Sequence, residues 1–380
     1  MGKRTRNHDT VEDAGGKNPN KISLGGEPIK HLKSSESSEE RSSYDDEHMK
    51  IIKTSSHGKV KKQSRFSIGF DEPYNSDCYE PVELPEKGRS FTVSVAIPTS
   101  FLAEVCPKRE IRTYVMGQLA RSISIFGVDE IVLYNDHCWN KTSNDNHNEY
   151  LEMMSTILQY QECPQYLRKH LVPQSPHLIS AGLLNPLAAP HHLRAQQWCK
   201  YREGVVVDRN GKSGSLVDVG LGRNVAVPDK TAEIGMRVTV KLPDAARVMA
   251  SPIGELVSPQ EPRLLHGITW GYTVRHADSL AQVISECESD ERYDFIIGTS
   301  DRGTPVQDLY IPKFKKLLIV FGGVAGLEEA LSCDAALTAT SPEELFDAYI
   351  NACIHQQTRT IRTDEAVPLV LAAVLPKLQR

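Results

Sequence analysis

Short apolar runs that end in glycine-rich or polar turns mark the C-terminal part of the chain. The runs 294–298 and 317–321 are followed by Gly-Thr-Ser-Asp-Arg-Gly (298–303) and by Gly322-Gly323, and the polar stretch 358–366 precedes the apolar run 367–375. Buried parallel strands of α/β sheets end in such turns, where glycine lets the backbone approach a ligand closely. The pattern predicts turns that converge on one pocket; the alternative is three ordinary strand-to-helix turns.

A strand–helix–strand unit is predicted further upstream. The run 91–97 alternates and predicts the first strand. A helix is expected to begin at Pro107 and to bury one face, because apolar residues recur at Ile111, Val115, Leu119 and Ile123. The run 130–134 predicts the second strand, which completes the unit.

Short strands separated by turn residues then replace this pattern. They are expected at 204–208, 215–219, 224–227 and 237–242. Asn210-Gly211 is a strong hairpin signal between the first two. This spacing predicts a small β-barrel, with an OB type favoured, and such barrels bind nucleic acids through basic and aromatic side chains. Aromatic residues are nearly absent here, so a purely structural barrel is the alternative. The basic residues are Lys212, Arg223, Lys230, Arg237, Lys241 and Arg247.

The barrel interrupts an α/β domain. A helix at 149–162 and an irregular, proline-rich stretch at 173–190 precede it, and a strand at 269–274 and a helix at 277–287 follow it. Residues 1–88 are polar, so we expect a disordered tail. Within this tail, the basic cluster 59–65 is a weak candidate for a nuclear localisation signal. The alternative is a run of charged residues that is simply solvated.

Composition narrows the function classes. At 380 residues the chain can hold two domains and a tail. No apolar run is long enough for a membrane span, and no secretory signal is expected. The eight cysteines include no Cys-x-x-Cys pair, which argues against disulfides and structural zinc. His191-His192 is poor metal-ligand geometry, so we expect a surface pair and no metal.

Net charge bears on nucleic-acid binding. The net charge of −5 is unusual for such a protein, because phosphate contacts require cations. Any RNA-binding charge must therefore be local, and the basic clusters are Arg109/Arg112, Arg168/Lys169 and the barrel residues.

Two motifs resemble a known superfamily. Val-Phe-Gly-Gly-Val-Ala-Gly-Leu-Glu (320–328) followed by Arg-Thr-Ile-Arg-Thr-Asp-Glu-Ala (359–366) is similar to the last two knot motifs of SPOUT methyltransferases. The phrases at 162–169, 182–187 and 270–275 resemble the archaeal and eukaryotic branch, in which an OB-like domain is inserted. The resemblance implies an α/β trefoil knot with these parts: tail 1–88, first part 89–172, inserted barrel 173–265, and second part 266–380 with the cofactor site.

The resemblance implies that S-adenosylmethionine binds at the turns. The implied cofactor-binding residues are Thr299, Arg302, Gly303, Phe321, Gly322, Gly323, Asn351, Ala352, Thr358, Arg359 and Thr360. The chain departs from the family at 353–357, where Cys-Ile-His-Gln-Gln replaces a loop that usually contains glycine and proline.

The ending at 360–366 is similar to that of SPOUT enzymes that methylate uridine N3, a weakly acidic position. A guanidinium beside N3 would stabilise its anion, so the candidate catalytic residues are Arg302, Arg362 and Arg112. The alternatives are that Arg362 only pairs with Asp364 or Glu365 and that Arg112 lies on a solvated helix face. Asp301 is a weaker candidate for a general base.

The leading hypothesis is an RNA methyltransferase that acts on uridine N3 in large-subunit (28S) rRNA. The alternative is an RNA-binding protein with a non-catalytic role at spindle poles and kinetochores or in small-RNA processing. The resemblance further implies a homodimer with shared active sites and a location in the nucleus, nucleolus and cytoplasm, with spindle and kinetochore association in mitosis.

Overall fold

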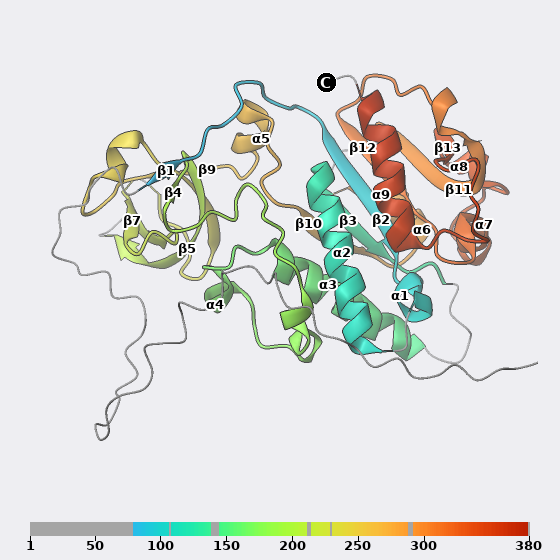
Figure 1. Cartoon of the computed structure of the whole chain (residues 1–380), viewed down its shortest axis with the longest axis horizontal. Helices are drawn as coiled ribbons and strands as arrows, with labels where there is room; N and C mark the ends of the chain where they lie inside the picture. The colour runs from blue at the N-terminus through green and yellow to red at the C-terminus, as the bar shows by residue number, and fades with distance from the viewer. Residues whose placement is uncertain are drawn as a thin grey trace, which may run out of the picture. The chain divides into compact units, whose positions relative to one another are not determined.

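A six-stranded parallel sheet forms the centre of the α/β part (Figure 1). The computed structural model describes residues 79–105, 108–137, 144–210, 214–228, 230–287 and 292–378. In their order across the sheet, the strands are β10 (Thr273–Ala277), β3 (Glu130–Tyr134), β2 (Thr92–Pro98), β12 (Lys316–Val320), β11 (Phe295–Pro305) and β13 (Ala348–Asn351). Its central strands are apolar on both faces, as expected for a sheet covered by helices on both sides.

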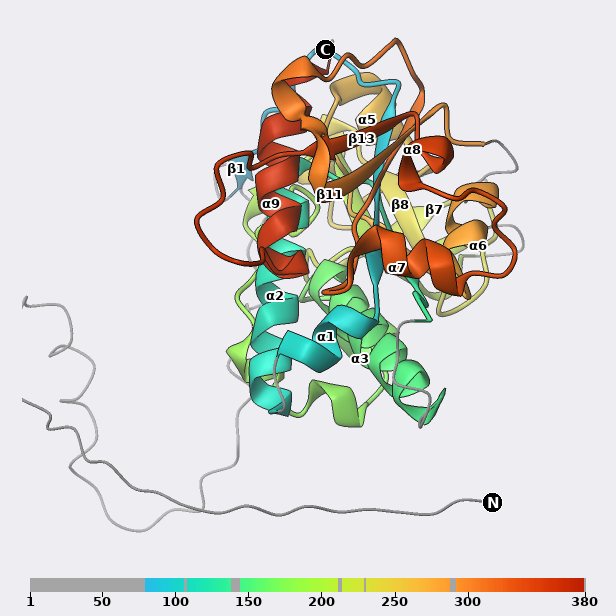
Figure 2. The ribbon, with the colours of Figure 1, turned by 90° about the vertical axis from the view of Figure 1, so that its right-hand side faces the viewer.

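Helices cover both faces of this sheet. The helices are α1 (Ser100–Val105), α2 (Arg109–Phe126), α3 (Asn144–Glu162), α4 (Arg168–Leu171), α5 (Glu261–His266), α6 (Leu280–Ser285), α7 (Gly326–Cys333), α8 (Pro342–Leu345) and α9 (Thr363–Val374). One core joins α2, α3 and α9 to one sheet face, and a second joins α6 and α7 to the other (Figure 2). Within the described ranges, no helix is long and apolar enough to cross a membrane.

A second, antiparallel sheet lies between β3 and β10 in the sequence. Its order is β7 (Asn224–Val227), β6 (Gly214–Asp218), β5 (Tyr201–Asn210), β8 (Arg237–Lys241) and β9 (Glu255–Val257). An isolated bridge between Ala226 and Ile253 joins β7 to the segment that enters β9, so the two edges of the sheet meet. The four expected strands are confirmed, and β5 pairs with β6 as expected for a hairpin, whose turn at 211–213 lies outside the described residues.

Two expectations were wrong in detail. The strand expected at 269–274 is β10, which begins only at Thr273, because Gly271 adopts a φ of 92° and Trp270 packs into a separate cluster with Tyr201. On α2, Ile111 is exposed although Leu119 and Ile123 are buried. A spacing of four residues rotates about 40° per step around a helix, so the series leaves the buried face.

The polar tail ends earlier than residue 88. Tyr79 packs edge-on against Trp198, with ring centroids 5.7 Å apart. β1 (Glu80–Pro81) pairs with β4 (Gln197–Trp198), and the Val82 amide donates to the Trp198 carbonyl at 2.7 Å. Residues 79–88 are thus part of the folded chain, which corrects the expected boundary; residues 1–78, with the cluster 59–65, lie outside the described residues.

A chain that begins at Arg89 should be less stable than one that begins at Tyr79. Val82 and Leu84 pack against the cluster that contains Tyr201 and Trp270. Loss of this partial burial and of the β1 hydrogen bonds should lower the free energy of unfolding by about 2–3 kcal/mol. Urea denaturation of the two truncated chains measures the difference, and equal stability would show that residues 79–88 contribute nothing to the fold.

Candidate functional site

A pocket of about 230 Å³ lies where β11, β12 and β13 end. It is formed by the bulged segment 299–304 within β11, the turn after β12, the loop after β13, and the first turns of α7 and α9. These two helices cover opposite faces of the sheet (Figure 2). The predicted convergence on one pocket is what the structure shows, but the turn expected at 298–303 is a bulge within β11, which continues to Pro305. Such edges are the usual ligand sites of parallel α/β sheets.

Side-chain hydrogen bonds hold the three turns together. The Thr299 hydroxyl donates to the Val320 carbonyl at 3.0 Å, and the Asn351 amide donates to the Asp301 carbonyl at 2.7 Å. The Thr363 hydroxyl, at the start of α9, donates to the Gly322 carbonyl at 2.9 Å. Because each bond crosses from one turn to another, the pocket walls are fixed relative to one another.

Two positions in these segments require glycine, because neighbouring backbone atoms leave no room for a Cβ atom. A Cβ on Gly322 would lie 2.7 Å from the Leu327 amide nitrogen, in the first turn of α7. A Cβ on Gly303 would lie 2.4 Å from the Ile350 carbonyl carbon, where β11 and β13 resume their pairing after a bulge. These glycines therefore bring α7 and β13 up against the turns of the pocket.

The lining combines apolar and charged side chains. Ile350, Ile361, Leu369 and Val370 supply apolar surface, and Asp301, Arg302, Glu328 and Arg362 supply charge. Arg302 Nη1 lies 3.5 Å from Glu328 Oε1. Arg362 caps α9 and pairs with Asp364 and Glu365 at 3.7 and 3.0 Å, as the alternative interpretation expected, while it also lines the pocket.

Most of the expected cofactor-binding residues meet in this pocket. Those that line it are Thr299, Arg302, Phe321, Gly322, Gly323, Asn351, Ala352 and Thr360. Gly303, Thr358 and Arg359 do not line it; the Thr358 hydroxyl donates to the Thr360 carbonyl instead. Arg112 is also outside the lining, since its guanidinium stacks on the Tyr150 ring at 4.7 Å. Glu328 also lines the pocket and was not predicted from the sequence. A carboxylate in the first turn of a helix that follows a glycine turn would have indicated it.

Several barrel cations expected to attract RNA bind the protein itself. Arg223 is buried and donates to the Arg247 carbonyl, Arg247 donates to the Tyr79 carbonyl, and Lys241 pairs with Glu261 at 2.8 Å. This corrects the expectation that these residues supply surface charge, and Lys212 lies outside the described residues.

The Arg168/Lys169 cluster differs from the barrel cations. The Arg168 guanidinium stacks on the Tyr160 ring at 4.0 Å. The Lys169 side chain is 66% exposed, although it lies 3.4 Å from Asp218. Lys169 therefore remains accessible to a phosphate.

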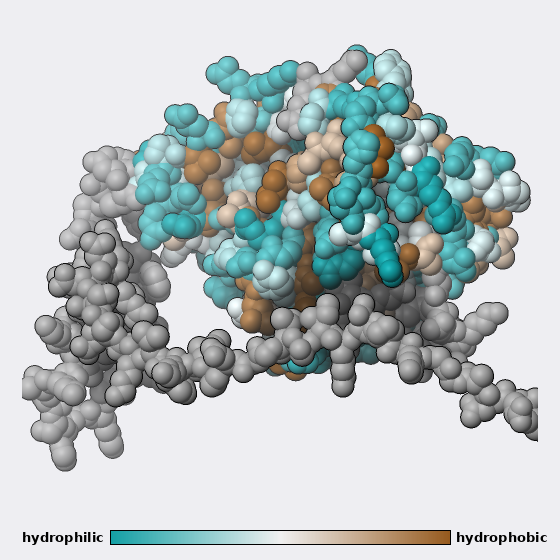
Figure 3. Space-filling view, turned by 45° about the vertical axis from the view of Figure 1, so that its right-hand side comes forward, coloured by the Kyte–Doolittle hydropathy of each residue, from teal (hydrophilic) through white to brown (hydrophobic). Residues whose placement is uncertain are grey.

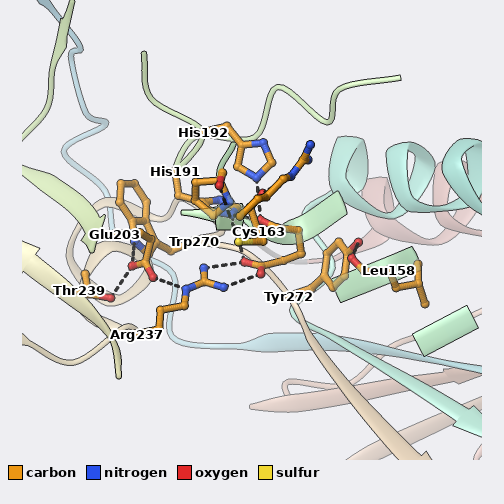
Figure 4. Close-up of polar contacts among 12 residues, drawn as sticks. Leu158, Cys163, His191, His192, Glu203, Arg237, Thr239, Trp270 and Tyr272 are labelled. Carbon is orange, nitrogen blue, oxygen red and sulfur yellow. Dashed lines mark hydrogen bonds and ion pairs between the residues drawn. The ribbon is translucent and has the colours of Figure 1, made fainter. Parts of the chain in front are cut away.

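A buried ion network joins the barrel to the α/β part (Figure 4). The Arg237 guanidinium donates to both oxygens of Glu162, at 2.6 and 2.8 Å, and to Glu203 at 2.6 Å. Glu203 also accepts hydrogen bonds from Thr239 and Trp270, at 2.6 and 2.7 Å. Burial would raise the pKa of Glu162, but its hydrogen bonds with Arg237 and His191 lower that pKa to about 2.

The histidine pair belongs to this network, so the expected surface pair was wrong. His191 is fully buried, and its Nε2 lies 2.9 Å from the Glu162 carbonyl and 3.0 Å from its carboxylate. His192 Nε2 lies 2.7 Å from the same carbonyl, and burial followed by the neighbouring His191 lowers the pKa of His192 to about 4. Among the described residues, no cluster of three or more histidine, cysteine or acidic residues could hold a metal ion.

A parallel sheet with a glycine-lined pocket at its carboxyl edge is the arrangement in which α/β proteins bind nucleotide cofactors and other ligands. Residues 92–374 match the family described as "Putative RNA methyltransferase". The chain belongs to this family, which confirms the RNA methyltransferase expected from the motifs.

Characterised relatives are similar over most of their length. The chain is 43% identical to the 28S rRNA (uridine-N(3))-methyltransferase of Mus musculus, over 77% of this chain and 78% of the relative. It is 43% identical to the enzyme of the same name from Homo sapiens, over 78% and 81%. A solved structure from Legionella pneumophila, described as the "putative methyltransferase Lpg2936" with bound SAM, is 9% identical, with a TM-score of 0.30 over 77% of this chain and 68% of that chain.

Proposed function

We propose that the protein transfers a methyl group from S-adenosylmethionine to N3 of a uridine in large-subunit rRNA. The pocket at the carboxyl edge of β11, β12 and β13 carries this proposal, because its lining residues lie within the part of the chain that matches the family. The relatives named for this reaction, at 43% identity, support the choice of base and RNA. With such a substrate, we also propose a location in the nucleus or nucleolus.

The chemistry of the lining fits S-adenosylmethionine. Its adenosine part needs apolar surface and backbone polar groups, which Ile350, Ala352 and Val370 provide. Its methionine part carries an ammonium and a carboxylate, and the lining offers both acidic and basic side chains. When bound, S-adenosylmethionine supplies an electrophilic methyl group.

The residues of the chain have to position the uracil and stabilise its N3 anion. Arg302 and Arg362 line the pocket, and a guanidinium held beside N3 favours loss of the N3 proton. Asp364 and Glu365 fix the orientation of Arg362, which reduces the reorganisation needed during reaction. Asp301 also lines the pocket and is our candidate to accept the proton.

The trefoil knot and the OB-like nature of the inserted barrel are part of this proposal. The closing bridge between Ala226 and Ile253 supports a barrel. The pairing of β10 with β3 supports the domain boundaries, because strands on either side of the insertion share one sheet. The loop 351–362, between β13 and α9, lines the pocket and is the segment that would complete the knot.

We also propose a homodimer with shared active sites. α2 and α9 pack against each other, yet Ile111, Tyr114, Ile125 and Leu369 on these helices are exposed. On the face drawn in Figure 3, apolar patches interrupt the hydrophilic surface. A two-fold interface would cover these side chains and bring Arg112 of one protomer towards the pocket of its partner.

Mixing two inactive variants tests the shared site. Arg112→Ala and Gly322→Val should each be inactive alone, because one removes the arginine given to the partner and the other the cofactor pocket. Random exchange makes about half of the dimers mixed, and one of the two sites in each mixed dimer is intact. Up to about a quarter of wild-type methylation should therefore be restored. A fully active monomer by light scattering at micromolar concentration would contradict the dimer.

Nucleoside mass spectrometry tests the reaction itself. Large-subunit rRNA from cells that lack the protein should lose 3-methyluridine at one position, and wild-type protein should restore it whereas Gly322→Val should not. An unchanged 3-methyluridine content, with RNA binding intact, would favour the non-catalytic alternative.

A further inference from the structure

An ion pair in the pocket is held loosely. Arg302 Nη1 and Glu328 Oε1 are 3.5 Å apart, longer than the roughly 2.7–2.9 Å of a close charge-assisted hydrogen bond. The Arg302 side chain is 76% exposed and that of Glu328 29%. The Ser300 hydroxyl donates to the same Glu328 oxygen at 3.3 Å. Exposed pairs of this kind add little stability, so either partner can be exchanged for a ligand group at small cost.

The other charged groups of the lining differ from this pair. Arg362 is held at the start of α9 by Glu365 at 3.0 Å and by Asp364. Asp301 shares the Ser300 hydroxyl with Glu328, and its own carbonyl accepts from the Asn351 amide. Arg302 lies on β11 and Glu328 on α7, so they form an ion pair between two elements of the lining. This pair is also open to solvent.

We propose that Arg302 and Glu328 are the subsite for the α-amino acid group of S-adenosylmethionine. This inference rests on the proposed function. Glu328 accepts hydrogen bonds from the ammonium, and the guanidinium of Arg302 donates to the carboxylate. A zwitterion replaces the protein's own ion pair charge for charge, so no net charge is left unpaired. Arg302 then serves the cofactor, which leaves Arg362 to act on the uracil.

This assignment predicts selectivity between adenosine derivatives. S-adenosylmethionine and S-adenosylhomocysteine both carry the amino acid group, but only the first carries a sulfonium charge. 5′-Methylthioadenosine keeps the adenosine and lacks the amino acid. Changes in the subsite should therefore alter the affinity for S-adenosylmethionine and S-adenosylhomocysteine but not the affinity for 5′-methylthioadenosine.

Isothermal titration calorimetry with these three compounds tests the subsite on full-length protein. Glu328→Gln should weaken S-adenosylmethionine and S-adenosylhomocysteine about tenfold, as expected for one charge-assisted hydrogen bond in a partly exposed site, and leave 5′-methylthioadenosine unchanged. Arg302→Gln should give the same pattern. Glu329→Gln is the matched control, because it makes the same change at an exposed neighbour outside the lining and should change no affinity.

Each other result overturns the inference. Equal weakening of all three compounds would give Glu328 a structural role, and weakening of S-adenosylmethionine alone would mean that it senses the sulfonium charge. Melting curves without ligand show whether each variant is folded, and Arg302→Gln replaces Glu328→Gln as the decisive variant if the latter is not. Failure of the wild-type protein to bind any of the compounds would instead refute the proposed function, and the subsite with it.

Discussion

Gly322→Val is expected to abolish binding of S-adenosylmethionine. A Cβ at this position would lie 2.7 Å from the Leu327 amide nitrogen and 2.8 Å from the Gly326 carbonyl carbon. These are backbone atoms, so the added side chain must displace the first turn of α7. That turn carries Glu328 and borders the pocket, and the Gly322 carbonyl also holds Thr363 of α9. One substitution therefore moves two walls of the site.

Thermal denaturation with and without ligand measures this effect. A ligand at about 100 times its Kd stabilises the wild-type protein by about 2.7 kcal/mol, and this gain should disappear in the variant. Gly182→Val is the matched control, because a Cβ there meets no atom within 4 Å. Undiminished stabilisation of Gly322→Val by S-adenosylmethionine would place the cofactor elsewhere.

Arg237→Met should lower the free energy of unfolding by about 3–5 kcal/mol, because it leaves buried carboxylates without their cation. Glu162 and Glu203 are both buried and both bind this guanidinium. Adding Glu162→Gln to the variant should recover part of the loss, since it removes one of the two unpaired charges. Urea denaturation of the single and double variants measures the coupling.

The dependence on pH provides an independent check. The folded-state pKa of Glu162, about 2, lies below its ordinary value of 4.5, so the ion pair stabilises the protein above pH 4.5 and this contribution is lost as pH falls towards 2. The shift corresponds to about 3 kcal/mol. In Arg237→Met, only the His191 contact still opposes the effect of burial, so the pKa of Glu162 should rise and acid should destabilise the variant less than the wild type. An identical acid response in both proteins would contradict this assignment.

The strands were predictable from sequence because local patterns encode them. The runs before Gly298 and Gly322 are short and apolar, and they became β11 and β12. The glycine-rich and polar residues after these runs line most of the pocket, and they too were recognisable from the local pattern. The start of β10 was not predictable from its apolar residues, because the positive φ of Gly271 and the packing of Trp270 against the barrel depend on tertiary structure.

The roles of charged residues were the harder part. Arg223 and Lys230 are both cations on the barrel, yet Arg223 is buried and donates to carbonyl groups. Nothing local in the sequence distinguishes a structural arginine from one that binds phosphate. His191 was misjudged likewise, since its partner Glu162 lies on another element.

The pairing of β3 with β10 has a consequence for synthesis on the ribosome. Ile131 pairs with Val274, and the whole antiparallel sheet lies between them in the chain. A nascent chain therefore exposes β3 as an unpaired edge until the insertion has been translated and β10 has emerged. Such edges recruit other strands, and contacts of high sequence separation form slowly. Protection of this edge by a chaperone, or rapid folding of the insertion as an independent unit, would reduce the time during which newly made chains aggregate.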